Sequence, residues 1–434
     1  MQNTMETFFE LKKNKTTLRT EVIAGITTFL TMAYILIVQP LTLAEAGMDF
    51  GAVFTATAIA SFIGTLVMAL VAKLPFALAP GMGLNAFFAF SVVVGMGRSW
   101  QFALTAVFLE GIIFILLTLF NVREAIVDSI PENIKKAISV GIGLFIAFVG
   151  FKNAGIIVAH ENTLVQLGSM GEPGVLVALI GLIGTGAFVA LKVRGALLVG
   201  ILGATVIGIP FGITTVREGF QIISAPPSIA PVFMQFEWGQ IFTFDMLLVV
   251  FTFLFVDMFD TVGTLVGVST KAGLMTEDGK IPRVKGALMA DAIGTTAGAM
   301  LGTSTVTTYI ESAAGVEEGG RTGLTALVTA FFFLIALFFS QVFLLIPAAA
   351  TAPALILVGV FMASPVKDIN FTDYTEAIPA FLTLIVMPLS FSISEGIVFG
   401  VLAYVFLKLL TGRHKEITPL TYVVGVFFLI SLVV

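Results

Sequence analysis

Two aspartates lie inside one of the most apolar stretches of the chain. The segment FLFVDMFDTVG, residues 253–263, carries Asp257 and Asp260 three positions apart. On a helix, this spacing places both carboxyl groups on one face, about 60° apart around the axis. Two acids this close stay ionised together only when a cation or a hydrogen-bond donor lies between them. A proton, a sodium ion or a hydrogen-bonding solute would serve, so the pair is a candidate binding site.

The composition predicts that these acids lie within a lipid bilayer. Hydrophobic residues make up 58% of the 434 residues and charged residues 11%, and the mean hydropathy is +1.06. Such a chain has too little polar surface for a soluble protein. Its apolar runs have the length that crosses the hydrocarbon core, so we expect about fourteen membrane-spanning segments. Their expected starts are Val22, Ala52, Phe76, Gln101, Ile134, Gly174, Gly195, Phe242, Gly286, Thr305, Gly323, Ala348, Ile378 and Ser392.

The positive charges predict the orientation. If the N-terminus is cytoplasmic, all but three of the 22 Lys and Arg residues fall on the cytoplasmic side, and the three exceptions are Arg98, Lys152 and Arg217. Cytoplasmic loops collect Lys and Arg, so we expect an integral protein of the plasma (inner) membrane with its N-terminus inside. We expect residues 413–434 to form an interfacial helix, with a fifteenth crossing as the alternative.

The third and tenth segments do not have the pattern of intact helices. KLPFALAPGMGLNAFFAF, residues 73–90, contains two prolines and two glycines before its helical part, and LGTSTVTTYIESAAGVEEGG, residues 301–320, begins with a β-branched run. Short matches also relate the two halves: TFL at 28–30 and 252–254, and IGT at 63–65 and 293–295. Two halves with an odd number of crossings would have opposite orientations. Interrupted segments at matching places indicate a binding site near the bilayer midplane.

Four further acids lie within or at the ends of the expected helices, and each would cost about 2.5 to 3.5 kcal/mol at a helix centre. Glu311 lies in a broken segment, which favours a functional role. Glu110, Asp291 and Glu395 are interpreted as structural groups near helix ends. Both histidines, His160 and His414, are expected in loops, so any proton coupling would depend on carboxyl groups. The chain has no cysteine, which excludes disulfides and cysteine ligands.

Three segments carry a resemblance to a known family. APGMGLNAFFAF, FVDMFDTVGTLVGV and TSTVTTYIESAAGVEEGGRTGLTAL resemble the signature segments of the AzgA-like adenine, guanine and hypoxanthine permeases, a branch of the nucleobase-ascorbate transporter superfamily. The N-terminal TEVIAGITTFLTMAYILIVQP fits the same family. The resemblance implies an all-α polytopic membrane protein with two inverted repeats of about seven helices, a broken third and tenth span, and core and gate domains.

The resemblance also implies a domain plan. The first repeat covers 1–212, with core spans at about 20–121 and gate spans at about 133–212. An extracytoplasmic connector follows at 213–241, and the second repeat covers 242–412, with core spans at about 242–345 and gate spans at about 347–411. It allows a homodimer, and it implies membrane lipid but no nucleic acid as a partner.

The family's substrate contacts fall on Asn85, Asp257, Asp260 and Glu311. A carboxylate and an amide can match the edge of a purine, and an aromatic ring such as Phe87 can stack on its face. We assign the purine edge to Glu311 and Asp260, a supporting contact to Asn85, and the proton site to Asp257. The reverse assignment of the two aspartates stays open, because coupled acids titrate as a pair.

The expected activity is secondary active import of a purine by proton symport, with Na⁺ as the alternative coupling ion and with no cofactor, metal or enzymatic activity. A uracil or xanthine carrier is the nearest alternative. An inorganic anion carrier of the same fold would suit the half-helix dipoles, but a site lined by acids repels anions. A channel would need no pair of broken helices. An intramembrane aspartyl protease would need a Gly-x-Gly-Asp element, which this sequence lacks.

Overall fold

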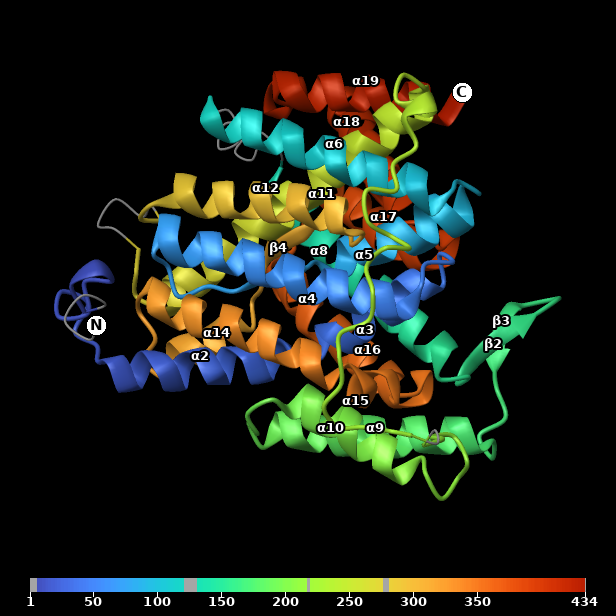
Figure 1. The fold of residues 1–434 in the computed structure, drawn as a ribbon. Coiled ribbons are helices and arrows are strands. Elements are labelled where there is room, and N and C mark those ends of the chain that lie inside the picture. The colour runs from blue at the N-terminus through green and yellow to red at the C-terminus, as the bar shows by residue number, and fades with distance from the viewer. Residues whose placement is uncertain (1–5, 121–130, 217–218, 276–280, 434) are drawn as a thin grey trace.

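Helices form nearly all of the regular structure in this computed structural model, which describes residues 6–120, 131–216, 219–275 and 281–433 (Figure 1). The helices of the first half are α2 (Leu18–Met32), α3 (Ile35–Ala44), α4 (Phe50–Val67) with η1 (Met68–Ala72), α5 (Met82–Ala86) with η2 (Phe87–Gly95), α6 (Trp100–Leu119), α8 (Glu132–Asn153), α9 (Pro173–Ala190) and α10 (Ala196–Ile207). Those of the second half are η3 (Trp238–Gln240), α11 (Phe244–Lys271), α12 (Val284–Leu301), α13 (Ser312–Glu317), α14 (Gly323–Ala336), η4 (Leu337–Phe339), α15 (Ser340–Leu344), α16 (Ala348–Met362), η5 (Ser364–Asp368), α17 (Tyr374–Ser390), α18 (Ile393–Leu410), η6 (His414–Glu416) and α19 (Pro419–Val433). The strands are β1 (Leu78–Pro80), β2 (Ile157–His160), β3 (Leu164–Leu167) and β4 (Val306–Thr308).

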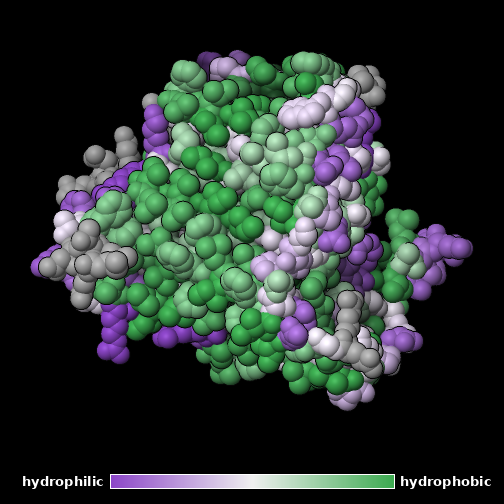
Figure 2. Space-filling view, in the orientation of Figure 1, coloured by the Kyte–Doolittle hydropathy of each residue, from purple (hydrophilic) through white to green (hydrophobic). Residues whose placement is uncertain are grey.

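The surface has the form expected of a membrane protein. Figure 2 shows a broad hydrophobic band with hydrophilic residues gathered at its left and right edges, and the long helices of Figure 1 run from one edge toward the other. Among the described residues, 9 helices are long and apolar enough to cross a membrane. The predicted starts Gln101, Ala348 and Ser392 lie within one residue of the first residues of α6, α16 and α18. The full count of fourteen crossings stays a prediction.

The two broken segments meet inside the bundle. β1 of the third segment pairs antiparallel with β4 of the tenth, with Leu78 opposite Thr308 and Pro80 opposite Val306. Proline and β-branched residues disfavour a helix in these segments. Extended backbone at membrane depth needs other partners for its N–H and C=O groups. Each strand therefore supplies hydrogen-bond partners to the other.

Two threonines hold the outer edges of this sheet in the same way. Thr65 on α4 donates its hydroxyl to the carbonyl of Leu78 at 3.0 Å and accepts from the N–H of Leu78 at 2.9 Å. Thr295 on α12 makes the matching contacts with Val306, at 2.9 and 3.2 Å. These threonines end the two IGT matches in the sequence. We call Thr65 and Thr295 the threonine clamps.

The glycine before each clamp allows α4 and α12 to cross closely beneath the strands. A Cβ atom on Gly294 would lie 3.2 Å from the Cα atom of Gly64 and 3.0 Å from Cγ1 of Val306. A side chain at this crossing would force the helices apart. The glycine and the threonine of each IGT match therefore have packing and hydrogen-bonding reasons for their positions.

The helices pack in two groups. α8, α9, α10, α16, α17 and α18 pack on one another, whereas α2, α3, α4, α6, α11, α12 and α14 form the other group. The helices of the first group fall within the ranges predicted for the gate domain and those of the second within the ranges predicted for the core domain, and the division into these domains stays a prediction. That the two groups move relative to each other stays a prediction. α19 packs on α18, and its Phe427 ring lies 4.9 Å from that of Phe251 on α11.

The connector between α10 and α11 runs across one end of the bundle (Figure 1). Its Ser224 N–H donates to the carbonyl of Phe338, and its Met234 N–H donates to the carbonyl of Met300, both at 2.9 Å. The β2–β3 hairpin projects near this end, on the side opposite the N-terminus (Figure 1). Arg217, one of the three predicted exceptions to the charge rule, lies outside the described residues.

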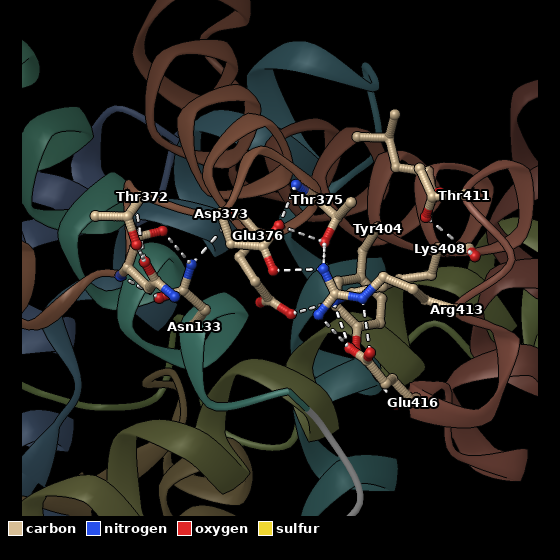
Figure 3. A network of polar contacts seen from close by, with 12 residues as sticks. Asn133, Thr372, Asp373, Thr375, Glu376, Tyr404, Lys408, Thr411, Arg413 and Glu416 are labelled. Atoms are coloured by element: carbon tan, nitrogen blue, oxygen red, sulfur yellow. Dashed lines mark hydrogen bonds and ion pairs between the residues drawn. The ribbon is translucent and has the colours of Figure 1, made fainter.

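An ionic network fixes the ends of α17 and α18 (Figure 3). Nη1 of Arg413 donates to Asp373 at 2.5 Å, and Nε donates to Glu416 at 2.6 Å. The buried Nζ of Lys408 lies 2.7 Å from both Glu376 and Glu416. Hydrogen bonds from Arg413 are the main reason that the pKa values of Asp373 and Glu416 are lowered to about 2. Both carboxylates therefore stay ionised at neutral pH, and α19 begins from a fixed end.

The threonine clamps generate a stability prediction. Thr65→Val and Thr295→Val each remove a hydroxyl that serves one buried N–H and one buried C=O, and each unsatisfied group costs about 1–3 kcal/mol. We expect both variants to lower the thermal denaturation midpoint of the detergent-solubilised protein by similar amounts. The control is Thr118→Val, because that buried hydroxyl has no hydrogen-bond partner among the described residues. An equal loss in the control would contradict this account.

Candidate functional site

An open pocket lies beside the crossing of β1 and β4. Its walls come from β4 and the turn after it, the start of α5, the middle of α11 and one face of α16. Its empty volume is about 420 Å³. The lining residues are Tyr34, Gly81, Met82, Gly83, Asp260, Thr264, Thr307, Thr308, Tyr309, Ile310, Glu311, Val358 and Met362. Because α16 belongs to the other group of helices, the pocket lies between the two groups.

The structure places two of the predicted site acids in this pocket. Asp260 reaches it from α11, and Glu311 reaches it from the residue before α13. Tyr34, between α2 and α3, donates its hydroxyl to Oε1 of Glu311 at 2.6 Å. The hydroxyl of Tyr309 donates to the carbonyl of Pro80 at 2.5 Å, which leaves the ring as a wall of the pocket. One carboxyl group is thus oriented by a tyrosine, and the two acids come from different segments, Asp260 from α11 and Glu311 from the turn before α13.

Asp257 does not line the pocket. It lies one turn before the pocket-lining part of α11, is fully buried, and its Oδ1 accepts a hydrogen bond from Thr261. The sequence predicts that Asp257 and Asp260 share one helix face, but the structure separates their surroundings. Asp260 can reach a solute in the pocket, whereas Asp257 contacts Thr261, whose hydroxyl also meets Thr307 of β4.

Asn85 and Phe87 are also buried behind the pocket rather than in its lining. The amide of Asn85 donates to the carbonyl of Pro80 at 3.4 Å, and its oxygen accepts from the hydroxyl of Ser304. The ring of Phe87 packs edge-on against Phe253, with centroids 4.8 Å apart. These contacts join the helix after β1 to the start of β4 and to α11. Direct substrate contacts by Asn85 and Phe87 stay predictions.

Two acids interpreted from the sequence as helix-end groups contact the β4 segment or its neighbour. Glu110 on α6 accepts a hydrogen bond from Thr305 at 2.6 Å, and Asp291 on α12 accepts one from Thr261. Both acids are fully buried. The position of Glu395 differs, since it lies half-buried in the first turn of α18. Carboxyl groups therefore surround β4 on the side away from the pocket as well.

Sequence reasoning missed several contributors to the site. Tyr34 is a single polar aromatic in an apolar run, and it lies at the break between α2 and α3, which the sequence does not signal. Thr264 follows Asp260 by one helical turn, which is a usable spacing signal. Within the described part of the chain, no group of three or more His, Cys, Asp or Glu side chains is arranged to hold a metal ion.

The apolar helices and a family-profile match together define a polytopic membrane transporter rather than an enzyme. The chain belongs to the Permease family, whose profile matches residues 19–399. Guanine/hypoxanthine permease PbuG of Bacillus subtilis is 48% identical over 438 residues, which cover 98% of this chain and 99% of that one. Adenine permease AdeP of Escherichia coli is 45% identical over 432 residues, 100% and 96% of the two chains. These findings confirm the family predicted from the signature segments.

A solved structure shares the fold at low sequence identity. The transmembrane domain of a cyanobacterium bicarbonate transporter, BicA, has a TM-score of 0.64 at 16% identity and matches 87% of this chain and 97% of that domain. At this identity, the likeness shows the fold alone. It confirms the predicted fold class.

The absence of cysteine makes the pocket directly testable. Thr264→Cys and Met362→Cys place single thiols in the lining, on opposite sides of the pocket. We expect both to react with a small water-soluble thiol reagent in the detergent-solubilised protein. Ala89→Cys is the control, because Ala89 is fully buried away from the pocket, and we expect it to react at least about tenfold more slowly. Equal rates at all three positions would contradict the pocket described here.

Proposed function

We propose that this protein imports purine nucleobases such as adenine, guanine and hypoxanthine by secondary active transport. Relatives that match almost the whole chain are named as adenine and guanine/hypoxanthine permeases. The observation that carries the proposal is the pair of carboxyl groups, Asp260 and Glu311, that enter one pocket from different segments of the chain. A purine edge presents N–H donors to such acceptors.

The surroundings of the two acids suit a flat, polar base. Glu311 is held by the hydroxyl of Tyr34, so one of its oxygens keeps a fixed direction while the other can accept from a base. Asp260 and the hydroxyl of Thr264 lie one turn apart on α11, where together they can accept and donate. The ring of Tyr309 and the side chain of Met362 offer apolar walls for the faces of the base.

Movement of the two helix groups would expose the pocket to each side in turn. Asp260, Thr264 and Glu311 belong to the group predicted as the core, whereas Val358 and Met362 belong to α16 of the predicted gate. Rocking of one group past the other would carry the bound base while the acids keep their arrangement. The threonine clamps support this mechanism, since they join the broken segments to α4 and α12 within one group. The matched clamps also support the inverted repeat that we propose for the two halves.

We infer that the transport is coupled to protons. Buried carboxyl groups are suited to carry a proton across a membrane, and Asp257 and Asp260 are the candidates on the site helix. A proton would reduce the repulsion among the acids and would favour binding of a neutral base. Base and proton would then be released together into the cytoplasm, so that the proton gradient drives accumulation. Na⁺ is the alternative coupling ion.

Two other classes of substrate can be distinguished from adenine, guanine and hypoxanthine. An inorganic anion is disfavoured, because Asp260 and Glu311 would repel it. Uracil or xanthine would also fit between carboxylates and aromatic walls, so uptake of the individual bases must be compared. The same uptake experiment therefore includes purines, uracil and sulfate.

The test is uptake of radiolabelled hypoxanthine, adenine, guanine, uracil and sulfate into proteoliposomes, with and without an inward proton gradient. We expect accumulation of purines only with the gradient. Asp260→Asn and Glu311→Gln should reduce purine uptake at low substrate concentration by about 10- to 100-fold, because hydrogen bonds to charged groups contribute about 1.5–3 kcal/mol.

The matched control is Glu395→Gln, since this acid lies outside the pocket. We expect it to retain most of the wild-type uptake. Normal uptake by both pocket variants would refute the assigned site, and uptake of sulfate instead of purines would refute the assigned substrate. Accumulation driven by a sodium gradient alone would replace the proton with Na⁺.

A further inference from the structure

One hydroxyl group joins three buried side chains behind the pocket. Oγ1 of Thr261 lies 3.1 Å from Oδ1 of Asp257, 2.9 Å from Oδ1 of Asp291 and 2.7 Å from Oγ1 of Thr307. Asp257 and Thr261 are one turn apart on α11, Asp291 is on α12, and Thr307 is on β4. The first three are fully buried, and Thr307 is exposed by only 1%. We call these four residues the buried aspartate cluster.

The hydrogen atoms of this cluster can be counted. Three contacts between oxygen atoms meet at Thr261, and each needs one hydrogen. A threonine hydroxyl supplies one hydrogen and accepts up to two, and an ionised carboxylate supplies none. Thr261 and Thr307 together supply two hydrogens. With both aspartates ionised, one contact would therefore place two lone pairs against each other within hydrogen-bonding distance.

We propose that Asp257 and Asp291 share one proton, which the hydroxyl of Thr261 bridges. With that proton on one carboxyl group, the carboxyl donates to Thr261, Thr261 donates to the other carboxylate, and Thr307 donates to Thr261. All three contacts then hold one hydrogen each. The arrangement is symmetric enough that either aspartate can carry the proton. This inference rests on the proposed proton coupling and assigns to Asp291 a part in it.

Three further acids among the described residues lie near the cluster. Asp260 follows Asp257 on α11, Glu110 on α6 accepts from Thr305 of the β4 segment, and Glu311 lies just after β4. A proton held by the cluster lowers the total negative charge of this group of acids. When they are ionised, these three acids have no hydrogen to donate to Thr261.

The cluster has a direct connection to the pocket. Thr307 contacts Thr261 on one side and lines the pocket on the other, together with Asp260 and Glu311. Loss of the shared proton leaves one contact between Thr261 and an aspartate without a hydrogen, and the resulting repulsion acts on the same hydroxyl that Thr307 of β4 contacts. Substrate binding and the proton would then stabilise the same position of β4. This linkage is what a symporter needs, because each ligand must favour binding of the other.

Infrared spectroscopy of the full chain in lipid, with the spectrum of each variant compared with that of the wild type, tests the shared proton directly. The wild type should show the C=O stretching band of a protonated buried carboxyl group, and this band should be lost in both Asp257→Asn and Asp291→Asn. Thr261→Ser should keep the band position, because serine also bridges. Thr261→Val should shift the band, because the bridging hydroxyl is gone.

Equilibrium binding of hypoxanthine over a pH series tests whether the shared proton and the substrate favour each other's binding. For wild type, we expect affinity to fall by about tenfold per pH unit once the proton is lost. Asp291→Asn supplies a permanent N–H donor, so its affinity should depend less on pH and its uptake should no longer accumulate substrate against a gradient. Glu395→Gln should behave like wild type in every measurement.

The outcomes separate this inference from the proposed function. The shared proton would be overturned, even if purines are transported, by a carboxyl C=O band that is unchanged in both Asp257→Asn and Asp291→Asn. It would also be overturned if the hypoxanthine affinity of Asp291→Asn had the pH dependence of the wild type. Bands that respond as expected while no purine binds would uphold the shared proton and refute the proposed substrate. If Asp257→Asn does not fold, the comparison of Thr261→Ser with Thr261→Val decides, because equal bands in these two variants would also overturn it.

Discussion

The structure depends on how extended backbone is satisfied at membrane depth. A bilayer offers no water to the N–H and C=O groups of a strand, so the broken third and tenth segments can be extended only if they pair with each other. β1 and β4 do so, and Thr65 and Thr295 take up the groups that remain on the outer edges. This mutual requirement brings the middle of the first half against the middle of the second half. The pocket and the acids that line it exist because of that meeting.

The same pairing explains why carboxyl groups can be tolerated here. The side chains of β4 and the residue before it offer hydroxyl groups to the surrounding helices, where Thr305 meets Glu110 and the pocket-lining Thr307 meets Thr261. Acids buried in an apolar bundle are costly without such donors. The acids therefore divide into two sets: Asp260 and Glu311 face the pocket, whereas Asp257, Asp291 and Glu110 face the hydroxyl groups. The first set suits a solute, and the second suits a proton.

The sequence predicted where the broken segments and the acids lie along the chain, but it predicted few of the residues that contact them. Hydropathy and the proline, glycine and β-branched patterns located the broken segments. The IGT matches indicated a repeat and contain both clamp threonines, whose hydrogen bonds to the strands the sequence did not predict. The i, i+3 spacing of Asp257 and Asp260 defined a helix face, but it could not show that only Asp260 would line the pocket, whereas Asp257 would contact Thr261. Asn85 and Asp291 illustrate the same limit, because their contacts with Ser304 and Thr261 join residues on different segments. The spacing of residues along the sequence indicates the face of its own helix on which a side chain lies. The role of these side chains depends on which neighbouring segment that face contacts.

The central claim is that a purine occupies the pocket between Asp260, Glu311 and α16. The most direct test uses Met362→Cys in this otherwise cysteine-free chain and measures the rate of thiol alkylation with and without saturating hypoxanthine. His160→Cys in the β2–β3 hairpin is the matched control. The account predicts that hypoxanthine slows alkylation at position 362 and leaves the rate at position 160 unchanged, and that Glu311→Gln abolishes this protection. Equal alkylation rates at position 362 with and without hypoxanthine, in a protein that still transports it, would contradict the account.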